Sequence, residues 1–254
     1  MAFWRFGIIL NIALRGLDRA LVISRVGQAT AFVFVPVSTI CAESLVVIPS
    51  HNHANFAILQ ARIHEIWARF FSSSMKDDLR YTPSDCFETF PFPEGYAHNP
   101  ILTAIGKQYY DFRANLLTRH NVGLTTLYNW FHDRDSACPE IPELRRLHAE
   151  MDRAALDAYG WTDIEPVCIF DSEFDDEDDE EESSRPGKKK YRYRWPDETR
   201  DEVLGRLLAL NQERALAEGQ IDSLDAPDLP TKKGARKAPT NKKKAAAASA
   251  SLFD

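Results

Sequence analysis

Residues 20–71, ALVISRVGQATAFVFVPVSTICAESLVVIPSHNHANFAILQARIHEIWARFF, decide the fold class because the hydrophobic period changes within them. Gly27 and Pro36 punctuate the first half, where β-branched and aromatic runs predict three strands. The predicted strands cover residues 20–26, 31–35 and 44–48. From residue 54 onward, apolar side chains recur every three or four residues instead, which predicts one amphipathic helix over residues 54–71.

From residue 100 onward the pattern is helical. Apolar stripes predict helices at residues 101–116, 124–132, 139–158 and 197–218, and Gly160 suits the left-handed position after the third of them. Two prolines in the FPFP segment at residues 90–93 end any regular element there, so we place a domain boundary near residue 95. We expect an α+β protein with a small, mixed, β-rich domain and its packed helix at residues 1–95. A helical domain at residues 96–218, with an acidic and basic loop at 165–195, follows it. Residues 219–254 carry Lys, Ala and Pro without an apolar period, which predicts a disordered basic tail.

The net charge of the chain hides two opposite regions. The 254 residues include 31 Lys and Arg against 38 Asp and Glu, for a formal charge of −7. Ten of those acids fall in residues 171–182, and the remaining chain has 28 acids against 31 bases. The acidity of the whole chain therefore does not exclude a polyanionic partner such as DNA.

Cysteine use and hydropathy bear on the compartment. The four Cys residues are far apart, form no CxxC pair and therefore predict reduced thiols in a cytoplasmic protein. No apolar run reaches the roughly 18 residues of a membrane span, so we expect no membrane partner.

Sequence motifs for cofactor and metal chemistry are absent. The chain has neither GxGxxG nor GxxxxGK[ST], which cradle phosphates, and it has no GxSxG nucleophile elbow. His51 and His53 are spaced as two ligands, but no further motif completes a metal site, so a solvated loop is the better interpretation. His64 falls on the polar side of its predicted helix and is expected at the surface. On these grounds we predict no catalytic residue, no metal site and no cofactor site in this chain.

Several unusual strings resemble one family. They are LDRALVISRVGQATAFVFVP at residues 17–36, FETFPFP at 87–93, TTLYNWFHD at 125–133 and MDRAALDAYGW at 151–161. In this order and spacing they resemble the C-terminal part of MmeI-like (type IIG/IIL) restriction-modification enzymes and related adenine-specific DNA methyltransferases. The resemblance covers roughly residues 3–218.

The resemblance implies a target recognition domain followed by a helical C-terminal domain. In complete family members an endonuclease domain and a Rossmann-like methyltransferase domain lie upstream, bind S-adenosylmethionine and carry an NPP[YF] motif. This sequence contains no NPP string. We therefore expect the DNA-recognition portion of an adenine-N6 methyltransferase, with double-stranded DNA as partner and an upstream methyltransferase or endonuclease polypeptide as a second one. Whether the chain acts in an enzyme reaction stays open at this point.

The resemblance also suggests DNA-contacting residues. Lys76 and Asp78 occupy alternate positions of the segment MKDDLRY, so on an extended chain they project to the same side. A Lys suits the O6 and N7 acceptors of guanine and an Asp suits the N4 amino group of cytosine, so this pair would read one G·C base pair. The expected phosphate contacts are Arg25, Arg62, Arg69 and Arg80.

Two alternatives remain beside DNA recognition. The Lys and Asp of the loop could simply pair with each other in solvent. The chain could also be a helical protein-interaction module, or a vestigial fragment that no longer binds DNA. The aromatic segments FETFPFP and YRYRW are expected to pack the two domains together, because large aromatic side chains dominate buried contacts.

Overall fold

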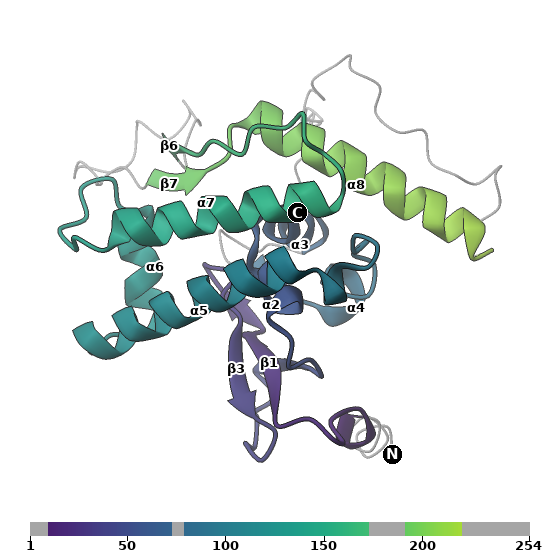
Figure 1. Cartoon of the computed structure of the whole chain (residues 1–254), viewed down its shortest axis with the longest axis horizontal. Coiled ribbons are helices and arrows are strands. Elements are labelled where there is room, and N and C mark those ends of the chain that lie inside the picture. Colours follow the sequence, from purple (N-terminus) through teal and green to yellow (C-terminus); the bar gives the residue numbers. More distant parts are fainter. Residues whose placement is uncertain (1–9, 73–78, 173–190, 220–254) are drawn as a thin grey trace, which may run out of the picture.

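The computed structural model describes residues 10–72, 79–172 and 191–219. In these ranges the chain has an α+β fold, as the sequence predicts, with a small sheet at one end and long helices at the other (Figure 1). None of the helices in the described ranges combines the length and apolarity that crossing a membrane requires.

The main sheet has three antiparallel strands in the order β3-β1-β4. They are β1 (Arg19–Ser24), β3 (Val33–Pro36) and β4 (Leu45–Ile48), which confirms the three predicted strand regions. Leu21 of β1 pairs with Phe34 on one side and with Ile48 on the other. After Ser24 the chain leaves this sheet and forms β2 (Val26–Gly27), which pairs with β5 (Leu79–Arg80).

The single helix expected over residues 54–71 is two helices, α2 (His53–Gln60) and α3 (Arg62–Phe71). Ala61 between them is extended, with φ −65° and ψ 153°. The backbone N–H of Arg62 donates to Oδ1 of Asp152 at 2.8 Å, so a side chain from α7 satisfies one of the free donors at the start of α3. The break depends on this distant partner, which the local hydrophobic pattern does not reveal.

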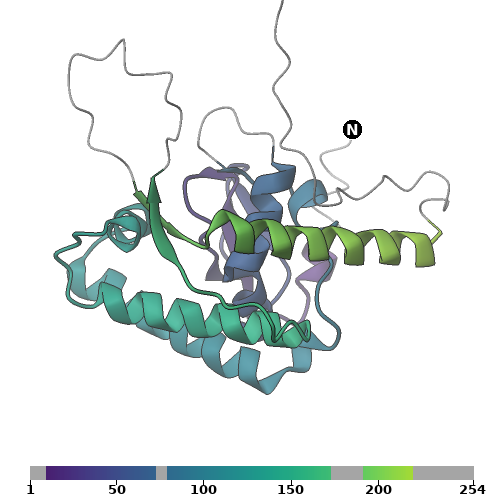
Figure 2. The same cartoon turned by 90° about the horizontal axis from the view of Figure 1, so that it is seen from above.

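Three long helices dominate the second half: α5 (Pro100–His120), α7 (Ile141–Ala158) and α8 (Asp197–Ala217). The side chain of Asn99 caps α5 by accepting from the N–H groups of Ile101 and Leu102. Gly160 follows α7 with φ +75°, the left-handed conformation expected for it. Helices α5 and α7 lie side by side, and α8 passes over α3 (Figures 1 and 2). The shorter helices are α4 (Pro83–Cys86), η1 (Tyr96–His98) and α6 (Leu124–His132).

A strand pair that the sequence did not predict flanks the acidic and basic loop. β6 (Ile169–Ser172) pairs antiparallel with β7 (Tyr191–Arg194). The aromatic ring of Phe170 on β6 lies 4.9 Å from that of Tyr193 on β7. Residues 173–190, with most of the acidic run, lie outside the described residues, as do residues 220–254 of the predicted tail.

One hydrophobic core runs through both parts of the chain, from Leu21 of β1 to Leu207 of α8. The FETFPFP segment contacts α8, because Asn211 donates to the carbonyl of Thr89 and Arg214 to that of Phe92, each at 2.6 Å. The Tyr193 ring of the YRYRW segment lies 5.8 Å from the ring of Phe131 on α6. The FETFPFP contacts therefore join the two predicted domains, as expected. The Tyr193–Phe131 contact lies within the helical part, and YRYRW reaches the first domain through the carbonyl of Tyr193, which accepts from Arg62 of α3 at 3.2 Å.

Candidate nucleic-acid interface

The turn between β1 and β2 brings two of the predicted phosphate contacts close together. Arg25 lies between β1 and β2, and its carbonyl accepts from the N–H of Tyr81 at 2.8 Å. Arg80 of β5 lies directly opposite Val26 of β2, so these two side chains share one face of the small sheet. Arg80 is exposed, and Arg25 is half-buried with its Nε donating to the carbonyl of Glu43 at 3.1 Å.

Two more arginines donate to the carbonyl of Gln28, which directly follows β2. We call residues 25–28 the Gln28 turn. The carbonyl of Gln28 accepts from Arg69 of α3 at 2.7 Å and from Arg192 of β7 at 3.1 Å. Arg69 also pairs with Glu65 through its Nε at 2.8 Å. Burial by itself raises the pKa of Glu65, but the positive charges of Arg69 and its neighbours outweigh it and lower this pKa to about 2. Glu65 therefore stays charged and holds Arg69 at the turn.

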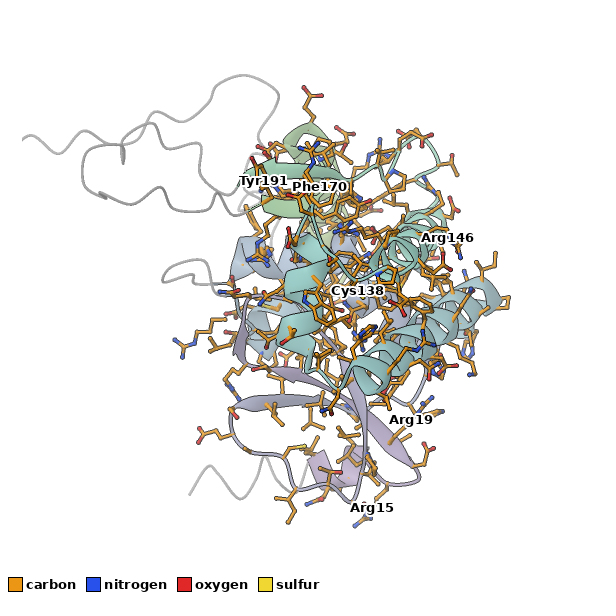
Figure 3. All side chains as sticks on the ribbon, turned by 90° about the vertical axis from the view of Figure 1, so that its left-hand side faces the viewer. Arg15, Arg19, Cys138, Arg146, Phe170 and Tyr191 are labelled. Atoms are coloured by element: carbon orange, nitrogen blue, oxygen red, sulfur yellow. The ribbon has the colours of Figure 1, made fainter. Side chains whose placement is uncertain are left out.

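A groove of about 1370 Å³ lies beside this turn. One wall is apolar and consists of β-strand side chains, with Val33, Val35 and Leu45 among them. The other wall comes from α6 and the loop after it, and Tyr191 and Arg192 of β7 also line the groove. Figure 3 shows Tyr191 and Phe170 at the end of the molecule far from Arg15 and Arg19. The groove thus lies between the sheet and the helical part, and its charged lining is mixed, with Arg134 and Arg192 beside Asp133 and Asp135.

A buried polar network fixes the two walls to each other. Gln60 of α2 accepts from the N–H of Phe32 at 3.0 Å and donates to the carbonyl of Thr30 at 2.7 Å. Arg113 of α5 donates to Oε1 of Gln60 and to the hydroxyl of Tyr128, both at 3.0 Å. Because Tyr128 belongs to α6, one network holds both the loop after Gln28 and the helix that faces it.

The structure corrects the expectation for Arg62, which cannot reach a phosphate. Its side chain is 5% exposed, and its NH1 lies 2.7 Å from Oδ2 of Asp152 and 2.6 Å from Nδ1 of His148. Burial by itself raises the pKa of Asp152, but His148 and Arg62 lower it below its ordinary value. Burial by itself lowers the pKa of Arg62, and the charge of Asp152 raises it overall. Arg62 and Asp152 therefore form a buried ion pair between α3 and α7.

The histidines near the groove are also structural. His64, expected at the surface, is fully buried, with Nε2 2.9 Å from the hydroxyl of Tyr81, and burial lowers its pKa to about 3. Nδ1 of His132 accepts from the backbone N–H of Tyr193 at 3.2 Å, and burial lowers the pKa of His132 to about 3 as well. Both imidazoles are therefore neutral at pH 7 and hold backbone or side-chain partners in place.

Lys76 and Asp78 lie outside the described residues, between Ser72 and Leu79. Their proposed role in reading a base pair stays a sequence-based prediction. Of the predicted phosphate contacts, the structure brings Arg25, Arg69 and Arg80 to the turn at residues 25–28. It adds Arg192, which the sequence shows only as part of the acidic and basic loop at residues 165–195. The alternation in YRYRW was the available signal that this run contains a strand.

Part of this region matches a known protein family. Residues 22–94 match the family model described as the target recognition domain of MmeI. This range contains the turn at residues 25–28 together with Arg69 and Arg80. The comparison with curated proteins gave no match.

Among solved structures, the chain is similar to the type IIL restriction-modification enzyme MmeI in complex with DNA. The two are 18% identical with a TM-score of 0.47, and the alignment covers 80% of this chain and 22% of that one. The chain thus spans about a fifth of the length of the solved protein it matches.

Proposed function

We propose that the chain, which contains an MmeI-like target recognition domain at residues 22–94, is the sequence-reading portion of a site-specific restriction-modification enzyme. In this proposal its partner is double-stranded DNA in the cytoplasm, and the enzyme is a type IIG-like adenine-N6 methyltransferase. The observation that carries the proposal is the family match over the same residues that form the basic turn beside the groove.

The arginines at the turn suit contact with phosphates. Proteins hold duplex DNA mainly through basic side chains on the phosphates, and these contacts set the register of the residues that read bases. Arg80 is exposed and lies opposite Val26 at the groove, so we propose it as the main phosphate contact. Arg69 and Arg192 bind the carbonyl of Gln28, so they shape the turn while adding positive charge to it.

Lys76 and Asp78 are the proposed base-reading pair. They precede β5 by a few residues, so Arg80 would hold a phosphate close to the base pair that they read. A Lys donor and an Asp acceptor at alternate positions match the guanine and cytosine edges of one pair in the major groove.

Methyl transfer belongs, in this proposal, to protein outside the 254 residues. An upstream methyltransferase or endonuclease polypeptide would bind S-adenosylmethionine, in keeping with the missing NPP[YF] and glycine-rich motifs. The apolar strand wall of the groove is chemically suited to protein contact, whereas the exposed Arg80 beside it is suited to phosphate.

Selection of bound duplexes from a random pool, at two salt concentrations, tests the proposal. We expect the full chain to enrich one sequence word, with affinity that falls as salt rises. Arg80→Ala should weaken binding about equally for all sequences and reduce the salt slope by about 1. Lys76→Ala with Asp78→Ala should instead relax the preference at one base pair. Arg146→Ala is the control, since Arg146 lies on α7 and pairs with Glu143 and Glu150.

The outcomes separate the alternatives. Salt-sensitive binding without an enriched word would leave only general DNA affinity. Absence of binding at low salt would contradict the proposal and favour the protein-interaction module. An equal loss for every sequence in the Lys76 and Asp78 double variant would remove the base-reading assignment while leaving DNA recognition in place.

A further inference from the structure

We propose that His120, Cys138 and Glu140, none of which lines the groove, form a zinc-binding site. His120 ends α5, Cys138 lies in the connection between α6 and α7, and Glu140 immediately precedes α7. Their ligand atoms all lie within 4.8 Å of one another. Figure 3 shows Cys138 well separated from Tyr191, one of the residues that line the groove.

The three interatomic distances match the edges of a tetrahedron around Zn²⁺. Zinc bonds of about 2.3 Å to sulfur and about 2.0–2.1 Å to nitrogen or oxygen, at tetrahedral angles, place S and N or S and O about 3.6 Å apart and N and O about 3.4 Å apart. In the structure Nε2 of His120 lies 3.3 Å from Oε2 of Glu140. Sγ of Cys138 lies 3.8 Å from that nitrogen and 3.3 Å from that oxygen. A zinc ion therefore fits with shifts of a few tenths of an ångström.

Neighbouring side chains orient the ligands. NH1 of Arg119 lies 2.9 Å from Oε1 of Glu140, which leaves Oε2 directed at the thiol and the imidazole. The ring of Trp130 stands edge-on to His120, with centroids 5.6 Å apart. Partners of this kind, one step removed from the metal, fix the orientation of the groups that ligate it.

The donor set selects the ion. One thiolate, one imidazole and one carboxylate suit Zn²⁺ better than Mg²⁺ or Ca²⁺, which prefer oxygen alone. Three protein ligands leave a fourth position for water. Cys138 must release its thiol proton to solvent when the metal binds, so zinc affinity should rise with pH.

The site would couple the helical part to the groove. It connects the end of α5 to the start of α7, and α6 is the helix between these two points in the chain. Helix α6 contributes the wall of the groove that the strands do not form. A bound zinc ion would therefore restrain that wall, and this role does not depend on the DNA-binding proposal.

Titration of the untagged full chain with ZnCl₂, in competition with a chromophoric chelator, tests the site. We expect one Zn²⁺ per chain, and a loss of at least about tenfold in affinity in Cys138→Ser and in His120→Asn. CoCl₂ should produce thiolate-to-cobalt absorption in the wild type and none in Cys138→Ser. Cys41→Ser and His51→Asn are matched controls outside the cluster and should bind zinc as the wild type does.

A second measurement needs no variant. Zinc should slow alkylation of Cys138 in the wild-type protein, followed by mass spectrometry, and leave the rate at Cys41 unchanged. Absence of stoichiometric zinc binding, cobalt binding without the thiolate absorption, or equal alkylation of Cys138 with and without zinc would each overturn the proposal.

Discussion

Arg62 and Arg69 are seven residues apart on α3 and differ in almost everything except residue type. Seven residues bring a helix back to nearly the same direction, with an offset of roughly 20°. The Arg62 side chain is 5% exposed and paired with Asp152, whereas the Arg69 side chain is 33% exposed and lies at the turn beside the groove. The hydrophobic period of the helix therefore cannot tell a core arginine from a surface one.

The difference arises from what covers each end of α3. At the first turn α7 supplies Asp152 and His148, which pair with the guanidinium, while Asp152 also caps the helix. At the last turn Arg69 instead meets Glu65 and the carbonyl of Gln28. Two arginines on one face thus serve two purposes, stability at the interior junction and shape and charge at the proposed DNA contact.

The prediction with the largest expected effect concerns the buried first turn of α3. Arg62→Ala leaves Asp152 charged and buried without its partner, so we expect a loss of about 3–5 kcal/mol in the free energy of unfolding. Urea titration measures it. Arg62→Met combined with Asp152→Leu should recover part of the loss, because neither charge then stays buried. A stable Arg62→Ala protein with weakened DNA binding would reverse the roles assigned to the two arginines.

A glycine in α5 tests the packing between the two parts of the chain. A Cβ on Gly106 would lie 2.3 Å from the carbonyl oxygen of His53, so Gly106→Ala should cost about 1–3 kcal/mol despite the better helix propensity of Ala. Gly205→Ala on the exposed side of α8 is the control. Apart from its chain neighbours and the nearby backbone of α8, no described atom would lie within 4 Å of a Cβ added at Gly205. Gly205→Ala should stabilise the protein by about 0.5–1 kcal/mol. Thermal unfolding of both variants measures these changes in stability. A Gly106→Ala protein that is stabilised, as Gly205→Ala is expected to be, would contradict close packing at Gly106.

As the pH falls, the buried His64 should lower the free energy of unfolding before the segment at residues 25–28 is affected. The pKa of His64 is about 3 in the fold against its ordinary 6.5, so below pH 6.5 the unfolded chain takes up a proton that the folded chain does not. Stability is unaffected by this group above pH 6.5 and should fall by about 1.4 kcal/mol per pH unit as the pH drops toward 3. Urea titrations at pH 7.5 and 5.5 should show a smaller drop in His64→Gln than in the wild type. An identical drop would argue against a neutral, buried His64.

The smallest effect on stability is expected at the partly exposed last turn of α3. Arg69→Ala removes a partly exposed ion pair with Glu65, so the free energy of unfolding should change by only about 0–1 kcal/mol. Its affinity for duplex DNA should fall, with a shallower salt dependence, because one positive charge leaves the turn. A stability loss as large as that of Arg62→Ala would show that the Gln28 turn belongs to the same buried network.

The local patterns predicted the strands and the positions of the long helices well, because each depends on residues close in sequence. The left-handed conformation at Gly160 is one example. The break at Ala61 escaped prediction, because Asp152, which caps α3, is 90 residues away in the chain. The β6–β7 pair was missed for a related reason, since a long charged segment separates its strands.

The candidate interface was predictable in part. The strings that resemble the MmeI-like family came from the sequence alone, as did Arg25, Arg69 and Arg80, which the structure places near residues 25–28 and whose contact with phosphates stays a prediction. The phosphate contact expected at Arg62 was wrong, because this side chain is buried. The sequence did not predict the groove or that Arg192 lines it. The cluster of His120, Cys138 and Glu140 also escaped notice, because 18 residues separate its first two members and no ligand motif joins them.

The sequence by itself determined the fold class and the similarity of residues 22–94 to the target recognition domain of MmeI, since hydrophobic period, helix-capping residues and characteristic strings are local properties. Only the tertiary structure decided which charged side chains are buried and which reach the groove. The physical reason is that burial depends on the element packed against each helix face. On α3 that element is α7 at one end and the Gln28 turn at the other.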